Sequence, residues 1–154
     1  MYSFLLSLHS IFRWLVLIAL IYAIYKSYNG WFSGRQYQKS DNTVRILSVT
    51  ITHIQFLIGV ILYFVSPLIS YFLNNFKDAV GERSVRFFGM EHSLMMLIAV
   101  ALISIGSGMA KRKPDSKQKF KAMAIFCTIG LLIILISIPW PFSPMAGRPY
   151  FRMF

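Results

Sequence analysis

The residues of this chain that could do chemistry are few, and they lie within long apolar stretches. All three histidines are found there, at His9, His53 and His92, together with the charged side chains Arg13 and Glu91. Ionisable groups inside a membrane span are costly, and they normally face the protein interior. We therefore take these five residues as the candidate site.

Two of the histidines are predicted to lie at the same depth in a membrane. With a rise of about 1.5 Å per residue, His9 and His92 fall about 9 Å below the outer surface, and His53 falls roughly 20 Å below it. Two imidazoles from different helices at one height can bind a haem iron from its two faces. We predict haem b with His9 and His92 as axial ligands, and we rank pairs that include His53 second.

Charged side chains accompany both predicted ligands. Arg13 follows His9 by four residues and shares its helix face, whereas Glu91 directly precedes His92. Arg13 and Glu91 could form a buried pair, either as an ion pair between two helices or as a group in which Glu91 orients a ligand imidazole. Four outer arginines are better placed than Arg13 for haem propionates that point outward: Arg83, Arg86, Arg148 and Arg152.

His53 and Gln55 are predicted to lie near the middle of the membrane, where polar groups could hold the head group of a quinone. Side chains two residues apart on a helix point about 200° from one another, so one pocket is not expected to contain both. We therefore favour hydrogen bonds to neighbouring helices for these two side chains.

The elements that must position these residues are membrane-spanning helices. The chain has 154 residues, of which 56% are hydrophobic and 14% charged, and this is too apolar for a soluble domain of that size. A bilayer core of roughly 30 Å needs about 20 mostly apolar residues per helix. Four stretches qualify, at 3–25, 45–66, 87–109 and 121–140. We predict an all-α integral membrane four-helix bundle, with the lipid bilayer as its surroundings and one domain over 1–154.

The positive charge is sorted between the connections. The formal net charge is +11, and lysines and arginines concentrate between spans one and two and between spans three and four. Both connections are therefore predicted to be cytoplasmic, which leaves the second connection and both termini outside, in the periplasm. The predicted location is a bacterial inner membrane. Nucleic acid is not an expected partner, because topology accounts for the charge.

The outer connection is predicted to contain a short amphipathic helix between the second and third spans. Apolar residues recur at helical spacing over 69–80, with polar residues on the opposite face, as in helices that lie on a membrane surface. Ser66-Pro67 should end the second span, and the segment 148–152 should fold back along the outer surface. The only cysteine, Cys127, is expected to be a buried packing residue.

Several strings in the chain resemble those of a family of small bacterial membrane proteins labelled cytochrome b or cytochrome b-like. The resemblance covers nearly the whole chain and implies a haem. The strings that carry it include His9-Ser10 with Arg13-Trp14, His53-Ile54-Gln55, Glu91-His92 and Ile138-Pro139-Trp140-Pro141. This chain has three histidines where better-known two-haem bundles have paired sets, so we do not expect a two-haem path across the membrane.

These observations lead to two main hypotheses. The first is a b-type haem protein that transfers electrons and exchanges them with a quinone or a respiratory membrane complex. The second is a cofactor-free accessory subunit of a larger complex, in which the buried polar residues fix helix packing. A proton-coupled carrier ranks last, since inverted repeats and broken helices are missing. An electron carrier or an accessory subunit is favoured over a stand-alone enzyme.

Overall fold

The structure is a computed structural model that describes residues 1–151. All regular elements in that range are helical. They are α1 (Tyr2–Ser33), α2 (Lys39–Val65), α3 (Pro67–Asn74), α4 (Phe76–Ala79), α5 (Arg83–Arg86), a π-helical turn (Phe87–Glu91), α6 (His92–Arg112) and α7 (Ser116–Ser137).

Four helical stretches are long and apolar enough to cross a bilayer. They are Tyr2–Ser33, Lys39–Val65, Arg83–Arg112 and Ser116–Ser137, and the third of them comprises α5, the π turn and α6. The prediction of an all-α chain with four spans is therefore confirmed. By the length and composition of these helices, the chain is a multi-pass membrane protein.

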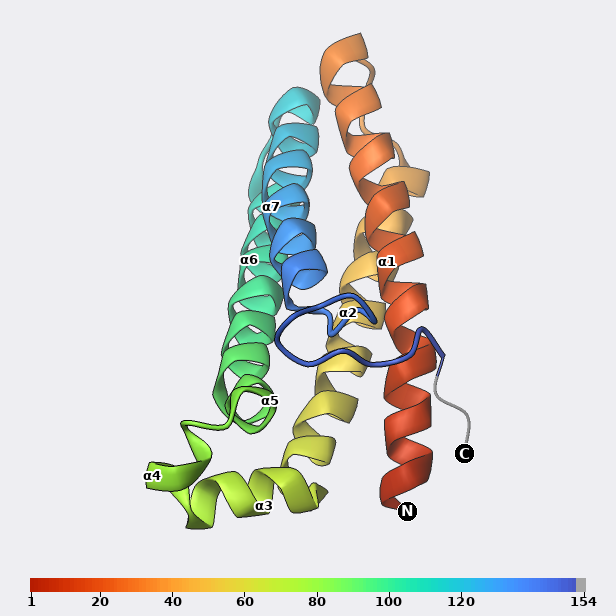
Figure 1. The fold of residues 1–154 in the computed structure, drawn as a ribbon. Coiled ribbons are helices and arrows are strands. Elements are labelled where there is room, and N and C mark those ends of the chain that lie inside the picture. The colour runs from red at the N-terminus through yellow and green to blue at the C-terminus, as the bar shows by residue number, and fades with distance from the viewer. Residues whose placement is uncertain (152–154) are drawn as a thin grey trace.

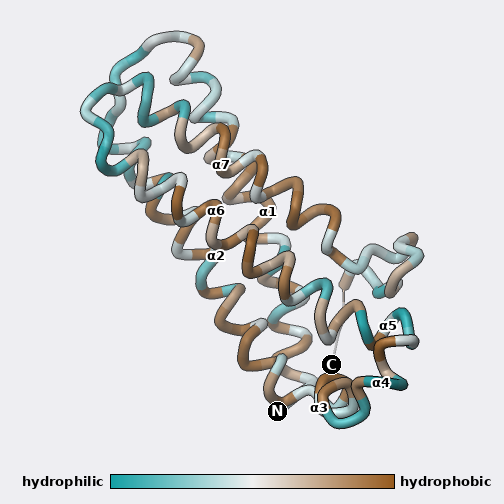
Figure 2. The backbone as a smooth tube through the Cα atoms, turned by 90° about the vertical axis from the view of Figure 1, so that its left-hand side faces the viewer, coloured by the Kyte–Doolittle hydropathy of each residue, from teal (hydrophilic) through white to brown (hydrophobic). Residues whose placement is uncertain are grey.

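The four long helices run alongside one another as a bundle (Figure 1). Helix α1 packs on α2 and α7, and α6 packs on α7 and α2, so α1 and α6 lie diagonally across the bundle. The N-terminus lies at the end of the bundle where α3, α4 and α5 are found, and the C-terminal segment up to residue 151 runs toward that end (Figure 1). Apolar residues cover the middle of the long helices, and polar residues gather at the connections (Figure 2).

Helix α1 continues to Ser33, past the end predicted at residue 25. Lys26 therefore lies within the helix, and its ammonium pairs with the carboxylate of Asp41 at 3.0 Å. Gly30 lets the last turns approach α7, since a Cβ at this position would lie 2.4 Å from the ring of Phe120. The helix ends at Gly34, whose φ of 67° is the left-handed conformation that favours glycine.

The connection between α2 and α6 departs from the single helix predicted over 69–80. Helix α2 ends at Val65 and Pro67 starts α3, as expected for a residue that cannot donate a backbone hydrogen bond. Asn75 then separates α3 from the one-turn helix α4. Helix α3 runs across the end of the bundle (Figure 1) and buries Ile69 and Phe72.

The core between α6 and α7 depends on small residues. Gly130 faces Ile103, and Gly106 faces Phe126, so closely that an added Cβ would lie 2.5 Å and 2.3 Å from these side chains. Cys127 is fully buried in the same core, which confirms its predicted packing role. Close approach of backbones is how helices associate where lipid supplies no hydrophobic driving force.

Replacing Gly106 with alanine is expected to lower the free energy of unfolding by about 1–3 kcal/mol, because the added methyl group overpacks the contact with Phe126. Chemical unfolding in detergent micelles measures the change. The matched control is Gly108→Ala, on the same helix, where the nearest atom to an added Cβ is the end of Arg112 at 3.8 Å. Equal losses in the two variants would contradict the predicted contact.

Candidate polar site between helices α1 and α6

A π-helical turn leads directly into the third histidine. Such turns insert one extra residue into a helix and occur often at functional sites. Here Gly89 lies in the turn, with the ring of Phe72 so close that a Cβ would come within 2.5 Å of it. The Tyr63 hydroxyl of α2 donates to the Gly89 carbonyl at 2.9 Å. The turn thus fixes where α6 begins, at His92.

His92 is oriented by the end of α7. Its Nδ1 lies 2.8 Å from the carbonyl oxygen of Ser137, the last residue of that helix. This carbonyl needs an outside partner, because the residue four positions on is Pro141, which has no N–H. Nδ1 must therefore donate, and Nε2 keeps a free lone pair. Metal-binding histidines are commonly held in this way.

Aromatic rings surround His92. The ring centroids of Phe87 and Phe88 lie 5.7 Å and 6.1 Å from that of His92. The guanidinium of Arg148, from the C-terminal segment, lies over Phe88 at 5.2 Å from the ring centroid. The imidazole is therefore enclosed largely by apolar surface.

His9 packs between α1 and α2. Its Cε1 atom lies 3.1 Å from the position that a Cβ on Gly59 would take, so the glycine makes room for the ring. Its backbone carbonyl accepts a hydrogen bond from Nε2 of Gln55 at 2.9 Å. Its Nδ1 is buried and has no hydrogen-bond partner within residues 1–151.

His9 and His92 come from the two diagonal helices α1 and α6. Residues 1–151 contain no group of three or more histidine, cysteine, aspartate or glutamate side chains that could hold a metal ion. A haem iron needs only two axial protein ligands. The His92 ring is held by the hydrogen bond of its Nδ1, and the His9 ring is enclosed against Gly59.

The buried pair between Arg13 and Glu91 does not form. Arg13 instead donates to the backbone carbonyl of Tyr150, which also accepts from Nε1 of Trp14 at 3.3 Å. Glu91 pairs with Arg86, with 2.7 Å between Oε1 and Nε. The π turn explains this choice, because residues five apart are stacked in π-helical geometry.

His53 ties α2 to α6. The side chain is exposed on the bundle, and its Nε2 lies 2.8 Å from the hydroxyl of Ser104. That hydroxyl donates its proton to the Val100 carbonyl at 2.7 Å, so Nε2 of His53 must be the donor. The interpretation of His53 as an interhelical hydrogen-bonding residue is confirmed. A ligand role would have to use its Nδ1.

The C-terminal segment folds back over the bundle, as predicted for residues up to Phe151; Arg152 lies outside the described residues. Trp140 meets Trp14 edge to face, with 6.1 Å between ring centroids, and Phe151 stacks on Trp14 at 5.5 Å. Arg83 donates to the Pro144 carbonyl at 3.2 Å. The segment therefore joins α1, α5 and α7 at the end of the bundle where His9 and His92 lie.

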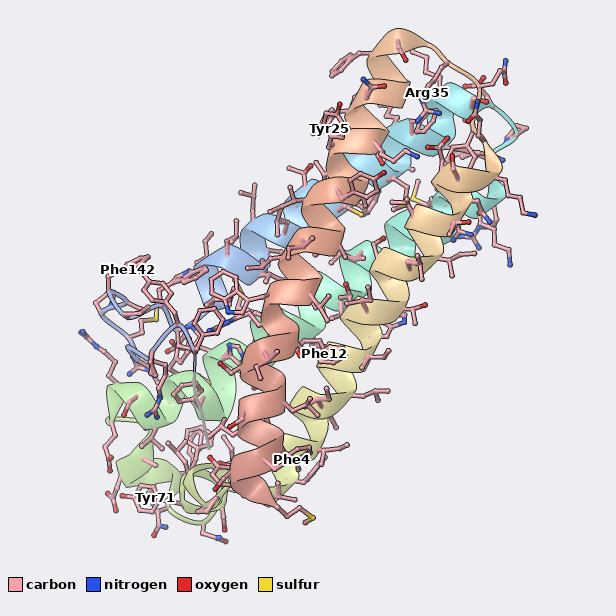
Figure 3. All side chains as sticks on the ribbon, turned by 90° about the vertical axis from the view of Figure 1, so that its right-hand side faces the viewer. Phe4, Phe12, Tyr25, Arg35, Tyr71 and Phe142 are labelled. Atoms are coloured by element: carbon pink, nitrogen blue, oxygen red, sulfur yellow. The ribbon has the colours of Figure 1, made fainter. Side chains whose placement is uncertain are left out.

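A second polar cluster, at the opposite end of the bundle, was not predicted. Asp41 is buried, with 5% of its surface exposed, and pairs with Lys26 at 3.0 Å. Arg35 contacts both carboxylate oxygens, at 2.6 Å and 2.8 Å, and these hydrogen bonds raise the pKa of Arg35. Figure 3 labels Arg35 at this end, far from Tyr71. The available signal was a lone acidic residue, Asp41, in a connection rich in lysine and arginine.

Tyr37 lies beside this cluster. Burial raises the pKa of its phenol, and its hydroxyl has no partner within residues 1–151. Tyr37 lines a cavity of about 10 Å³ together with Lys26, Asp41 and Arg45. Arg45 in turn donates to the Ser107 hydroxyl at 2.7 Å, which joins α2 to α6. The cluster thus fastens the connections at one end of the bundle.

The chain was compared with known proteins, and no protein-family model, no curated protein and no solved structure matches it.

Proposed function

We propose that this chain is a b-type haem-binding membrane protein that transfers electrons, with His9 and His92 as the axial ligands. The observation that carries the proposal is the hydrogen bond from Nδ1 of His92 to the Ser137 carbonyl, which leaves Nε2 free on a helix diagonal to the one that bears His9. The resemblance to cytochrome b-like proteins in the strings around these residues supports the same assignment.

The haem would supply one-electron chemistry, and the residues of the chain would position and insulate it. The α7 terminus holds the His92 ring, and Gly59 gives the His9 ring its place on α2. Aromatic contacts join Trp14 to Trp140 and to Phe151 at the same end of the bundle. Water exclusion and ligand hydrogen bonding are two of the means by which a protein sets a haem potential.

Among the outer arginines that the structure describes, one suits the haem propionates best. Arg83 and Arg86 are engaged by the Pro144 carbonyl and by Glu91. Arg148 makes its side-chain contact with the ring of Phe88, beside His92, and so keeps its donors for a carboxylate. We assign the role of propionate partner to Arg148.

The proposed location is a bacterial inner membrane with both termini in the periplasm. The connection at 34–38 and the connection at 113–115 are flanked by most of the basic residues, so that end of the bundle is assigned to the cytoplasm. Helix α3 then lies at the outer surface, with Ile69 and Phe72 directed into the protein. A quinone or a respiratory membrane complex would be the electron-exchange partner.

A specific observation also favours the alternative, a cofactor-free accessory subunit. Several polar side chains inside the bundle join neighbouring helices, as in His53 with Ser104 and Tyr63 with Gly89. Residues with this role stabilise a bundle without any cofactor. The hydrogen bond of His92 belongs to the same pattern if no haem is present.

Absorption spectra of the purified protein, oxidised and then reduced with dithionite, separate the two hypotheses. We expect a reduced b-type α-band that is lost in His9→Ala and in His92→Ala, because each removes an axial ligand. His53→Ala is the matched control, since Nε2 of His53 is bonded to Ser104, and it should keep the band. Protein made in haem-replete cells without any such band would exclude the haem.

A further inference from the structure

The two basic connections of the chain meet at one end of the bundle. The side-chain hydroxyl of Ser116 accepts a hydrogen bond from the backbone N–H of Tyr37 and donates one to the side-chain oxygen of Gln36, both at 3.0 Å. Ser116 begins α7, and the other two residues belong to the connection between α1 and α2. Figure 2 shows this end as the hydrophilic end opposite the N-terminus. The basic residues of both connections are therefore gathered at one surface.

Some of the cations at this end are used inside the protein. The carboxylate of Asp41 pairs with Lys26 at 3.0 Å and with Arg35 at 2.6 Å. The ammonium of Lys119 lies 5.2 Å from the ring centroid of Tyr37, a cation–π contact that joins the two connections. These cations stabilise the connections themselves.

Five other basic residues at this end have no such use. Within residues 1–151 their side chains make no hydrogen bond, ion pair or ring contact, and all but the third lysine are fully exposed: Lys39, Lys111, Arg112, Lys113 and Lys117. We call these five residues the basic face. The only acidic residue between positions 111 and 121 is Asp115, whose carboxylate is engaged by the backbone N–H of Gln118 at 3.0 Å. The anions that neutralise the basic face must therefore come from outside the chain.

The length of α1 places this end of the bundle among lipid head groups. The helix has 32 residues, and at about 1.5 Å per residue its length of roughly 48 Å exceeds a bilayer core of roughly 30 Å. Its last turns carry the aromatic residues that are common at membrane interfaces. Trp31 stacks there with Tyr28 and Phe32, at 6.0 Å and 5.2 Å between ring centroids.

Helix α7 connects the basic face to this aromatic level. The ammonium of Lys121 lies 5.6 Å from the ring centroid of Trp31. Lys117 lies one helical turn closer to the start of α7, which is about 6 Å farther from the middle of the bilayer. The basic face thus begins at the depth where aromatic side chains mark the interface, and it extends outward from there.

We propose that the basic face binds the phosphate groups of anionic phospholipids at the membrane surface. Clusters of about four to eight basic residues directly beside a membrane span attract such lipids, and long cationic side chains extend to reach them. Lipid fits better than a soluble acidic protein, because the ring of Phe32 is 76% exposed and a bilayer offers apolar surface at the same depth. The proposal does not depend on a haem.

Quenching of Trp31 fluorescence by brominated lipids tests the proposal in a bilayer. The chain has three tryptophans. Trp14→Phe with Trp140→Phe leaves Trp31 as the reporter, and Trp14→Phe with Trp31→Phe leaves Trp140 at the opposite end of the bundle. The vesicles contain equal amounts of phosphatidylglycerol and phosphatidylcholine, and one of the two lipids is brominated at a time. We expect Trp31 to report about fivefold preference for phosphatidylglycerol, and Trp140 a smaller one.

Charge variants separate the basic face from other cations. In the Trp31 reporter, Lys111→Gln, Lys113→Gln and Lys117→Gln together should reduce the preference to that seen by Trp140. Arginine at the same three positions should keep it, because the charge is retained. The control is Lys77→Gln, an exposed lysine at the other end of the bundle. Equal quenching of Trp31 by the two lipids, or a preference that survives in the glutamine variant, overturns the proposal and leaves the charge to topology or to an acidic protein partner.

Thermal unfolding of the unmodified chain gives a second measurement. In detergent micelles, added phosphatidylglycerol should raise the unfolding temperature by about 2–4 °C or more, because a ligand that binds only the folded state stabilises it. An equal amount of phosphatidylcholine should not. The shift should disappear in the glutamine variant and shrink in about 1 M salt, which screens exposed charges. Equal shifts with the two lipids overturn the proposal.

Discussion

Replacing Asp41 with asparagine is expected to lower the free energy of unfolding by about 2–4 kcal/mol. The substitution leaves Lys26 and Arg35 without their shared anion, and breaking a buried pair in this way strands the remaining charges. The cost lies toward the lower end of the usual range because the Lys26 and Arg35 side chains are 21% and 30% exposed and keep access to water.

The matched control is Asp115→Asn. Asp115 caps α7 by accepting a hydrogen bond from the backbone N–H of Gln118 at 3.0 Å, and asparagine caps helices about equally well. Unfolding in detergent micelles should therefore separate the two variants clearly. A similar, small loss in both would mean that the Asp41 cluster contributes no more than an ordinary helix cap.

The four spans were predictable from sequence because a bilayer requires helices of a certain length and hydropathy. Both properties can be read from each stretch of sequence by itself. Helix ends were predictable where one residue decides them, as Pro67 does for α2. The extension of α1 beyond residue 25 was not, since its last turns pack through Gly30 on Phe120 of a distant helix. The break at Asn75 between α3 and α4 was not predicted either.

Within the candidate site, the sequence predicted which side chains lie inside the bundle better than it predicted their partners. Arg13 meets the Tyr150 carbonyl, a backbone group of the folded-back C-terminal segment that no helix periodicity indicates. Glu91 takes Arg86 because a π turn brings residues five apart together. The partner of His92 is a backbone carbonyl freed at the end of α7, and its presence follows from Pro141 only once that helix end is known.

The three histidines show how one residue type serves different roles in one bundle. His53 is a donor on the lipid-facing side, where a bond to Ser104 saves the cost of an unpaired polar group. His92 is held at Nδ1 by a hydrogen bond, whereas Nδ1 of His9 is buried and has no partner in the part of the chain that the structure describes. His9 and His92 are the two that lie on diagonal helices and are less exposed than His53.

Gly59 provides a test of that pair that changes neither histidine. Gly59→Leu is expected to abolish the b-type absorption band, because a Cβ at this position already lies 3.1 Å from Cε1 of His9 and the larger side chain must displace the ring. Leucine is a better helix former than glycine, so α2 itself should persist. Reduced-minus-oxidised spectra at matched protein concentration measure the loss.

Gly108→Leu on α6 is the control, since that glycine faces only the flexible end of Arg112. This variant should keep the band, which separates a local displacement of His9 from a general effect of adding bulk. Gly59→Ala should give an intermediate result, because its methyl group requires a shift of only a few tenths of an ångström. A full absorption band in Gly59→Leu would mean that His9 does not bind the iron. Loss of the band in Gly59→Leu but not in Gly108→Leu would mean that the iron lies beside α2.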